Sequence, residues 1–170
     1  MQNKLKFAAA LGIMMLALQG LNAQYTGQVN FSQADVNIEQ AIGWHIAGMA
    51  GCTMETEAGK PYLPVKLLNI AIPAGKTVTG IEILVKQQQV LAGTYNIMPT
   101  QPEQIPGEPE PDFVGPEPGI YSTDALWPAE FMYYTASGFR SGVHIAGLLY
   151  YPLQYNPVTQ KPVSYTHLRA

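Results

Sequence analysis

Residues 143–157 read VHIAGLLYYPLQYNP and form a strongly apolar run. Two sets of side chains alternate along it: Val143, Ile145 and Leu149 on one face, and His144, Ala146, Leu148 and Tyr150 on the other. Both sets are largely apolar, which is typical of a strand covered on both faces. The run therefore predicts a central strand of a β-sandwich, with His144 at the edge of a core face rather than in a ligand site. The Asn156-Pro157 pair that follows predicts a turn.

Working outward, further strand signals precede this run. PAEFMYYT, residues 128–135, reads as a strand, and GFRSG, residues 138–142, reads as a glycine-rich turn. Earlier, Leu68, Ile70 and Ile72 alternate with Asn69 and Ala71, and Ile81, Ile83 and Val85 alternate with Gly80, Glu82 and Leu84. Because only a short glycine-containing segment separates these two runs, the pattern predicts that they form an antiparallel hairpin.

The fold class follows from these strands. No sustained helical periodicity appears after residue 23, and proline and glycine separate the short strands. This pattern predicts an all-β fold, an antiparallel β-sandwich of two sheets resembling a jelly roll, over residues 59–163. Residues 24–58 are poorly patterned, and they predict a leader with one possible first strand.

The first residues have the layout of a secretory signal peptide. MQNKLK supplies positive charge, FAAALGIMMLALQGL supplies an apolar stretch, and LNAQ follows. This arrangement predicts a signal peptide over residues 1–23, with cleavage between Ala23 and Gln24. It also predicts a secreted, periplasmic or cell-surface protein, with no stable membrane insertion once the peptide is removed.

Charge excludes several classes of partner. Without Lys4 and Lys6 of the signal peptide, seven Lys and Arg stand against twelve Asp and Glu, a net charge of −5. Nucleic acid binding requires clustered positive charge, so no nucleic acid partner is expected. Binding to an anionic membrane surface is disfavoured for the same reason.

Nucleophilic and metal-ligating residues are sparse. Cys52 is the only cysteine, so no internal disulfide is expected, and we assign it a structural or incidental role. His45, His144 and His167 lack the spacing of a metal site. The sequence therefore predicts no metal, no cofactor and no catalytic residue.

An acidic, proline-rich tract divides the strand signals. Residues 99–119, PTQPEQIPGEPEPDFVGPEPG, hold seven prolines and five acidic residues, and no Lys or Arg lies between Lys86 and Arg140. Proline lacks an amide donor, so the tract cannot lie within a sheet. It is expected on the surface, extended and polyproline-like in places.

An ordered set of motifs resembles a known family. GKPYLPV opens the set at residue 59, followed by IAIP at 70–73, Trp127-Pro128, GFRSG at 138–142 and YPLQYNPVTQK at 151–161. In this order they resemble the N-terminal propeptide of gingipain-type cysteine peptidases of the caspase clan. The positions that carry the resemblance, to which it gives a structural role, are Gly59, Pro61, Leu63, Pro64, Pro128, Gly138, Arg140, Gly142, Pro152, Gln154, Tyr155, Asn156 and Pro157.

The resemblance implies a β-sandwich propeptide that keeps the downstream protease domain latent and assists its folding. In this family a surface loop occupies the substrate cleft, and by position that loop falls in the acidic tract. Members specific for basic residues carry Arg or Lys there, which this chain lacks. Either another side chain enters the specificity pocket, or the loop blocks the cleft without filling the pocket, or the tract is only a linker. The candidates for insertion are Gln101, Glu103, Gln104, Glu108, Glu110 and Asp112.

The resemblance also implies that this chain is not itself an enzyme and that its precursor continues into a cysteine endopeptidase. SYTHLRA at residues 164–170 resembles translated adapter sequence, so we expect this segment to be foreign to the natural protein or truncated. The alternative function is a secreted β-sandwich module that binds carbohydrate or a surface protein, because the chain has ten tyrosines and two tryptophans.

Overall fold

The computed structural model describes residues 28–30, 33–82 and 85–169. The predicted signal peptide, with its cleavage between Ala23 and Gln24, lies outside these residues. The strands of the described part are β1 (Gln28–Asn30), β2 (Val36–Ala41), β3 (Trp44–Met49), β4 (Thr53–Met54), β5 (Pro64–Ala71), β6 (Val85–Val90), β7 (Met132–Arg140), β8 (Val143–Tyr150), β9 (Leu153–Asn156) and β10 (Lys161–Arg169). Two short helical turns accompany them, η1 (Gln33–Asp35) and α1 (Pro118–Tyr121).

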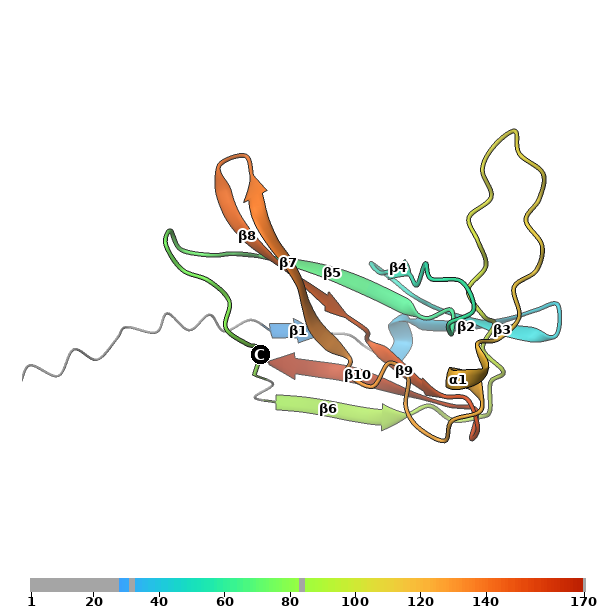
Figure 1. Ribbon diagram of the computed structural model, residues 1–170. Helices are drawn as coiled ribbons and strands as arrows, with labels where there is room; N and C mark the ends of the chain where they lie inside the picture. The colour runs from blue at the N-terminus through green and yellow to red at the C-terminus, as the bar shows by residue number, and fades with distance from the viewer. Residues whose placement is uncertain (1–27, 31–32, 83–84, 170) are drawn as a thin grey trace, which may run out of the picture.

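The strands form antiparallel sheets (Figure 1). One sheet has the order β4-β5-β8-β7, and another has the order β1-β10-β6, with β9 also paired to β10. β2 and β3 make a separate hairpin. The predicted all-β antiparallel sandwich is therefore confirmed.

The apolar run at residues 143–150 is strand β8, and it is central in its sheet, between β5 and β7. Ala146, Leu148 and Tyr150 are buried on one face, as their alternation predicts. The other face is only partly covered, since Val143 is exposed and Leu149 is half-buried. The side chains of one face of β8 thus build the core, whereas those of the other face border solvent.

The predicted hairpin of residues 68–72 and 81–85 is wrong. β5 pairs with β4 and β8, whereas β6 pairs with β10 in the other sheet. Period-two alternation identifies the buried face of a strand, but it carries no information about the neighbouring strand. Two strands that bury their faces against one core from opposite sheets show the same pattern as two strands of a hairpin.

The single possible strand predicted in residues 24–58 understates that region, which contains β1 to β4. Ala47 and Met49 of β3 lie in the hydrophobic core. Ala41 pairs with Trp44, so the β2–β3 turn consists of Ile42 and Gly43, with φ of 51° and 81°. Such two-residue turns normally carry Asn-Gly or Asp-Gly, and an isoleucine at the first position conceals the turn from sequence reasoning.

At the C-terminal end, residues 164–169 continue strand β10 and pair with both β6 and β1. Whether residues 164–170 belong to the natural protein stays a prediction, because a foreign segment with strand-forming side chains can also extend a strand.

Most of the motif positions are core positions. Gly59, Pro61, Leu63, Pro64, Pro152, Gln154, Tyr155 and Pro157 are buried. Pro128 and Asn156 are half-buried, whereas Gly138, Arg140 and Gly142 are exposed at the end of the projecting β7–β8 hairpin (Figure 1). Of the buried members, Gly59 bonds to Thr100 and Pro61 forms a β-bridge with Pro99, so these two lie beside the start of the acidic tract.

Candidate functional site

Residues 101–115, here called the acidic loop, follow β6 and precede α1 in the chain. They project from the sandwich (Figure 1). Residues 103–113 are all exposed and belong to no strand. The predicted position of the tract on the surface and outside the sheets is therefore confirmed for residues 103–113, but it is wrong for Pro99 and Thr100, which are buried. The loop and the β7–β8 hairpin are the most prominent projections in this view.

The two ends of the loop are held together by the backbone of Gly59 and Lys60. The Gly59 amide donates to the Thr100 carbonyl at 2.9 Å, and the Thr100 amide donates to the Lys60 carbonyl at 2.7 Å. On the other arm, the Glu117 amide donates to the Gly59 carbonyl at 3.0 Å. Gly59 has φ of 87°, which favours glycine, and a Cβ there would lie 3.5 Å from the Gly115 carbonyl oxygen. These four residues, Gly59, Lys60, Thr100 and Glu117, form the neck of the loop.

Just outside the neck, the side chain of Gln101 joins the two arms. Its Oε1 accepts the Val114 amide at 2.9 Å, and its Nε2 donates to the Val114 carbonyl at 2.9 Å. The same Nε2 donates to the Pro99 carbonyl at 2.8 Å. A carboxamide that pairs with both backbone groups of one residue imitates a step of a β-ladder. The loop consequently starts from a defined position although no strand lies within it.

Replacing Gln101 with Ala removes all three of these hydrogen bonds. We expect the arms to separate and the loop to lose preorganisation, so that the Val114 amide exchanges its hydrogen about tenfold faster. The thermal midpoint should fall by less than about 4 °C, because the site is only half-buried. Hydrogen exchange of variant and parent, with the exposed Gln87→Ala as control, measures this effect. Equal exchange of the Val114 amide in Gln101→Ala and Gln87→Ala would show that the amide bridge does not order the loop.

A tight turn closes the far end of the loop at residues 105–108. The Glu108 amide donates to the Ile105 carbonyl at 3.1 Å, and Gly107 has φ of 90°. Proline followed by glycine at the two central positions is the composition of a type II turn. The Gln104 Nε2 also donates to the Glu108 carbonyl at 3.1 Å and to the Ile105 carbonyl at 3.4 Å. Hydrogen bonds within the loop therefore hold its apex as well as its neck.

The acidic side chains are arranged along both arms and are all exposed. Glu103 precedes the apex turn, Glu108 ends it, and Glu110 and Asp112 follow on the returning arm. The sequence places no lysine or arginine between Lys86 and Arg140 to neutralise them. The loop thus presents a concentrated negative charge to any binding partner.

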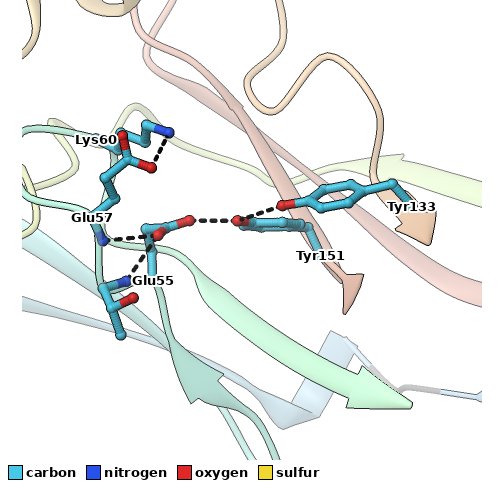
Figure 2. Close-up of polar contacts among 6 residues, drawn as sticks. Glu55, Glu57, Lys60, Tyr133 and Tyr151 are labelled. Atoms are coloured by element: carbon cyan, nitrogen blue, oxygen red, sulfur yellow. Dashed lines mark hydrogen bonds and ion pairs between the residues drawn. The ribbon is translucent and has the colours of Figure 1, made fainter. Parts of the chain in front are cut away.

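A buried tyrosine fastens the residues next to the neck to the sandwich (Figure 2). The Tyr151 hydroxyl donates to the Glu55 carboxylate, and the Tyr133 hydroxyl lies 3.5 Å from the Tyr151 hydroxyl. The other Glu55 oxygen accepts the amides of Thr56 and Glu57, each at 2.9 Å. Burial, reinforced by the bond to Glu55, raises the pKa of Tyr151, so its hydroxyl stays a donor. Glu57 in turn pairs with Lys60 of the neck.

Comparison with known proteins identifies the family of this chain. The family model described as Propeptide_C25 matches residues 19–170. The chain belongs to the Propeptide_C25 family. It is the propeptide of a gingipain-type cysteine protease precursor, and it is not itself catalytic.

Two solved structures share the fold of this propeptide. The first, "Complex of Porphyromonas gingivalis RgpB pro- and mature domains", is 19% identical with a TM-score of 0.71 and covers 88% of this chain and 80% of that chain. The second, "Structural insight into zymogenic latency of gingipain K from Porphyromonas gingivalis", is also 19% identical, has a TM-score of 0.66, and covers 85% of this chain and 96% of that chain. No curated protein matches the chain.

The family assignment decides between the two functions that the sequence predicts, in favour of the propeptide over a carbohydrate-binding or adhesion module. The aromatic side chains support this reading, since Tyr150, Tyr155 and Tyr165 are buried in the core. Among the described residues, no helix has the length and apolarity needed to cross a bilayer.

The predicted insertion candidates occupy different parts of the loop. Gln101 lies beside the neck and Gln104 at the apex, and both amides bond to the loop backbone. Glu103, Glu108, Glu110 and Asp112 extend into solvent. Which of the six, if any, enters a protease pocket stays a prediction. The sequence reasoning did not single out Ile105, although the Pro106-Gly107 pair beside it marks a turn.

Cys52 and the histidines have ordinary surroundings. Cys52 is half-buried, and burial raises the pKa of its thiol while Lys66 lowers it. The His45 Nδ1 accepts the Asn96 amide at 3.0 Å, and the His144 ring stacks on Phe139 with centroids 4.8 Å apart. The side chain of His167 lies outside the described residues. Each contact of His45 and His144 is one that a structural histidine makes.

Proposed function

We propose that this propeptide keeps the protease domain of its precursor latent by placing the acidic loop in the substrate cleft, and that it assists the folding of that domain. The precursor leaves the cytoplasm through the signal peptide at residues 1–23. The observation that carries the proposal is a long exposed loop bonded at both its neck and its apex. The two solved structures that share this fold concern a complex of pro- and mature domains and zymogenic latency.

The bonding of the loop favours tight docking. A segment that is already ordered loses little conformational entropy when it binds, so more of its contact energy appears as affinity. Pro102, Pro106, Pro109 and Pro111 restrict the backbone between the bonded ends. Because propeptide and protease share one chain, the effective concentration of the loop near the cleft is about millimolar. A modest intrinsic affinity is therefore sufficient for latency.

The loop composition also protects it from cleavage. Proline removes the amide hydrogen of its own residue and constrains the residue before it, so bonds next to proline fit a protease cleft poorly. The four prolines between Pro102 and Pro111 leave few bonds without a neighbouring proline. The loop can occupy the cleft as a substrate-like segment and remain intact.

The proposal is tested by replacing residues 103–113 with a Gly/Ser segment of equal length. Inhibition of the mature protease should weaken by about 100-fold or more, since contacts worth about 3 kcal/mol correspond to that factor. The thermal midpoint should change by less than about 3 °C, because these residues are exposed and Gln101 and Val114 remain. Inhibition assays and thermal unfolding of the same samples measure both effects.

The control is the same Gly/Ser replacement at residues 74–77, which are equally exposed and lie outside the strands. It should leave inhibition within about twofold of the parent, since it removes none of the proposed contacts. Undiminished inhibition by the acidic-loop replacement would show that the loop is only a linker. A large fall in its thermal midpoint would show that the loop is structural.

A further inference from the structure

We infer that Ile105 enters the primary specificity pocket of the protease, and that the protease therefore cleaves after aliphatic residues such as Ile, Val and Leu. This inference rests on the proposed function, since it assumes that the acidic loop lies in the cleft. Because the loop has no Lys or Arg, the residue that enters the pocket and the substrate class of the protease are otherwise undetermined, and the inference names both.

Ile105 lies in the apex turn, the part of the loop furthest from its neck. It is the first residue of that turn, whose ends join through the Glu108 amide and the Ile105 carbonyl at 3.1 Å. Its side chain is apolar and 54% exposed. An aliphatic side chain exposed in this turn can enter an apolar pocket of a partner, and its burial there is favourable.

The neighbouring side chains are less suited to this pocket. The carboxamides of Gln101 and Gln104 are bonded to the loop backbone. Phe113, the other exposed large apolar residue of the loop, is at its foot, where its ring lies 6.5 Å from the ring of Trp44. Near the apex this leaves the carboxylates, Pro106 and Ile105, and the ring of Pro106 is closed onto its own backbone, so it extends less far than the Ile105 side chain.

The carboxylates lie on both arms of the loop. Glu103 lies two residues before Ile105, and Glu108 is the last residue of the apex turn. Burying a carboxylate requires a paired cation in the pocket, whereas burying an aliphatic side chain requires only an apolar one. Acidic residues on both arms are better placed to contact the rim of the cleft, where they steer association.

The backbone around Ile105 explains how it can fill a specificity pocket without being cut. The bond after it is Ile105–Pro106, a tertiary amide whose nitrogen carries no hydrogen. The Ile105 carbonyl oxygen accepts the Glu108 amide and the Gln104 side-chain amide within the loop. For cleavage, this oxygen must instead accept donors of the protease as negative charge develops on it. The apex turn therefore holds the scissile carbonyl in an unproductive orientation.

The first test uses the mature protease of the precursor and peptides that differ only in the residue before the scissile bond. We expect kcat/KM for Ile, Val and Leu peptides to exceed that for Arg, Lys, Glu and Gln peptides by about tenfold or more. A preference for Glu or Gln would overturn the inference and point to the carboxylates or amides of the loop. A preference for Arg or Lys would overturn it as well.

The second test compares Ile105→Glu with Val158→Glu in the intact chain. Val158 is 52% exposed, almost the same as Ile105, and lies in the β9–β10 turn. Ile105→Glu should raise the inhibition constant by about tenfold or more, whereas Val158→Glu and the conservative Ile105→Val should stay within about threefold. Equal thermal midpoints of the three variants show that any loss lies in binding and not in folding.

The Gly/Ser replacement of residues 103–113 distinguishes failure of the proposed function from failure of the assignment of Ile105. If it abolishes inhibition while Ile105→Glu does not, the proposed function stands and the assignment of Ile105 is wrong. If neither change weakens inhibition, both are wrong. Loss of inhibition in both, with parent-like inhibition by Val158→Glu, supports both.

Discussion

As the pH rises above 10, the propeptide is expected to lose stability and unfold. Burial raises the pKa of several tyrosine hydroxyls above their ordinary value of about 10, namely those of Tyr121, Tyr150, Tyr151, Tyr155 and Tyr165. These hydroxyls remain protonated in the fold at a pH where they ionise in the unfolded chain. Ionisation of the unfolded chain therefore draws the equilibrium away from the fold.

The sign follows from the raised pKa values. Below pH 10 both states bind the phenolic protons, and the full stability is present. As the pH rises above 10, the unfolded chain binds fewer protons than the fold, so stability falls by about 1.4 kcal/mol per tyrosine for each pH unit. The three tyrosines with large shifts, Tyr121, Tyr150 and Tyr151, together lose about 4 kcal/mol per pH unit, against a total stability of about 5–15 kcal/mol for a domain.

Urea unfolding at pH values from about 8 to 11.5, followed together with tyrosinate absorbance, measures this effect. We expect absorbance and unfolding to rise together, since the buried hydroxyls ionise when the fold opens. Tyr151→Phe should reduce the slope of stability against pH, because it removes one of the tyrosines with a raised pKa. Complete tyrosine ionisation near pH 10 without unfolding would contradict the prediction.

Replacing Tyr155 with Ala is expected to lower the free energy of unfolding by about 3–5 kcal/mol. The side chain is fully buried, and its hydroxyl donates to the Tyr95 carbonyl at 2.7 Å. The same oxygen accepts the Ile97 amide at 3.4 Å. Tyr155 thereby connects β9 with the segment that leads into the neck of the acidic loop, so its loss affects both the core and the support of the loop.

Two further variants divide this effect into its parts. Tyr155→Phe keeps the ring and removes the hydroxyl, so it should cost about 1–2 kcal/mol. Tyr134→Ala removes a tyrosine that is 41% exposed and should cost less than half as much as Tyr155→Ala. Chemical denaturation of the three variants measures these differences. An equal loss in the free energy of unfolding for Tyr155→Ala and Tyr134→Ala would mean that Tyr155 contributes no more to stability than an exposed tyrosine.

The alternation of apolar residues and the positions of glycine and proline were sufficient to predict several local features of the fold. Apolar side chains at every second position correctly predicted β8 and the buried face of β5. Asn156-Pro157 correctly predicted the turn after β9. GFRSG predicted the turn after β7 only at Ser141 and Gly142, because Gly138 to Arg140 continue strand β7, which begins at Met132 and not at Pro128. The prolines of residues 99–119 correctly predicted a surface segment outside the sheets for residues 103–113, although Pro99 and Thr100 at the start of the tract are buried. Each of these features depends on neighbouring residues alone, so the sequence contains its full physical cause.

The tertiary structure alone decided which distant residues meet. It placed β5 and β6 in opposite sheets, and it placed the β2–β3 turn at Ile42 and Gly43. It brought Gln101 to Val114 across the loop and Glu55 to Tyr151 across the fold, and it left Ile105 at the apex. Pairing between strands and between side chains depends on packing of the whole core, because many partners are compatible with one local pattern. The acidic loop could thus be predicted from composition, but its neck, its apex and the residue that it presents could not.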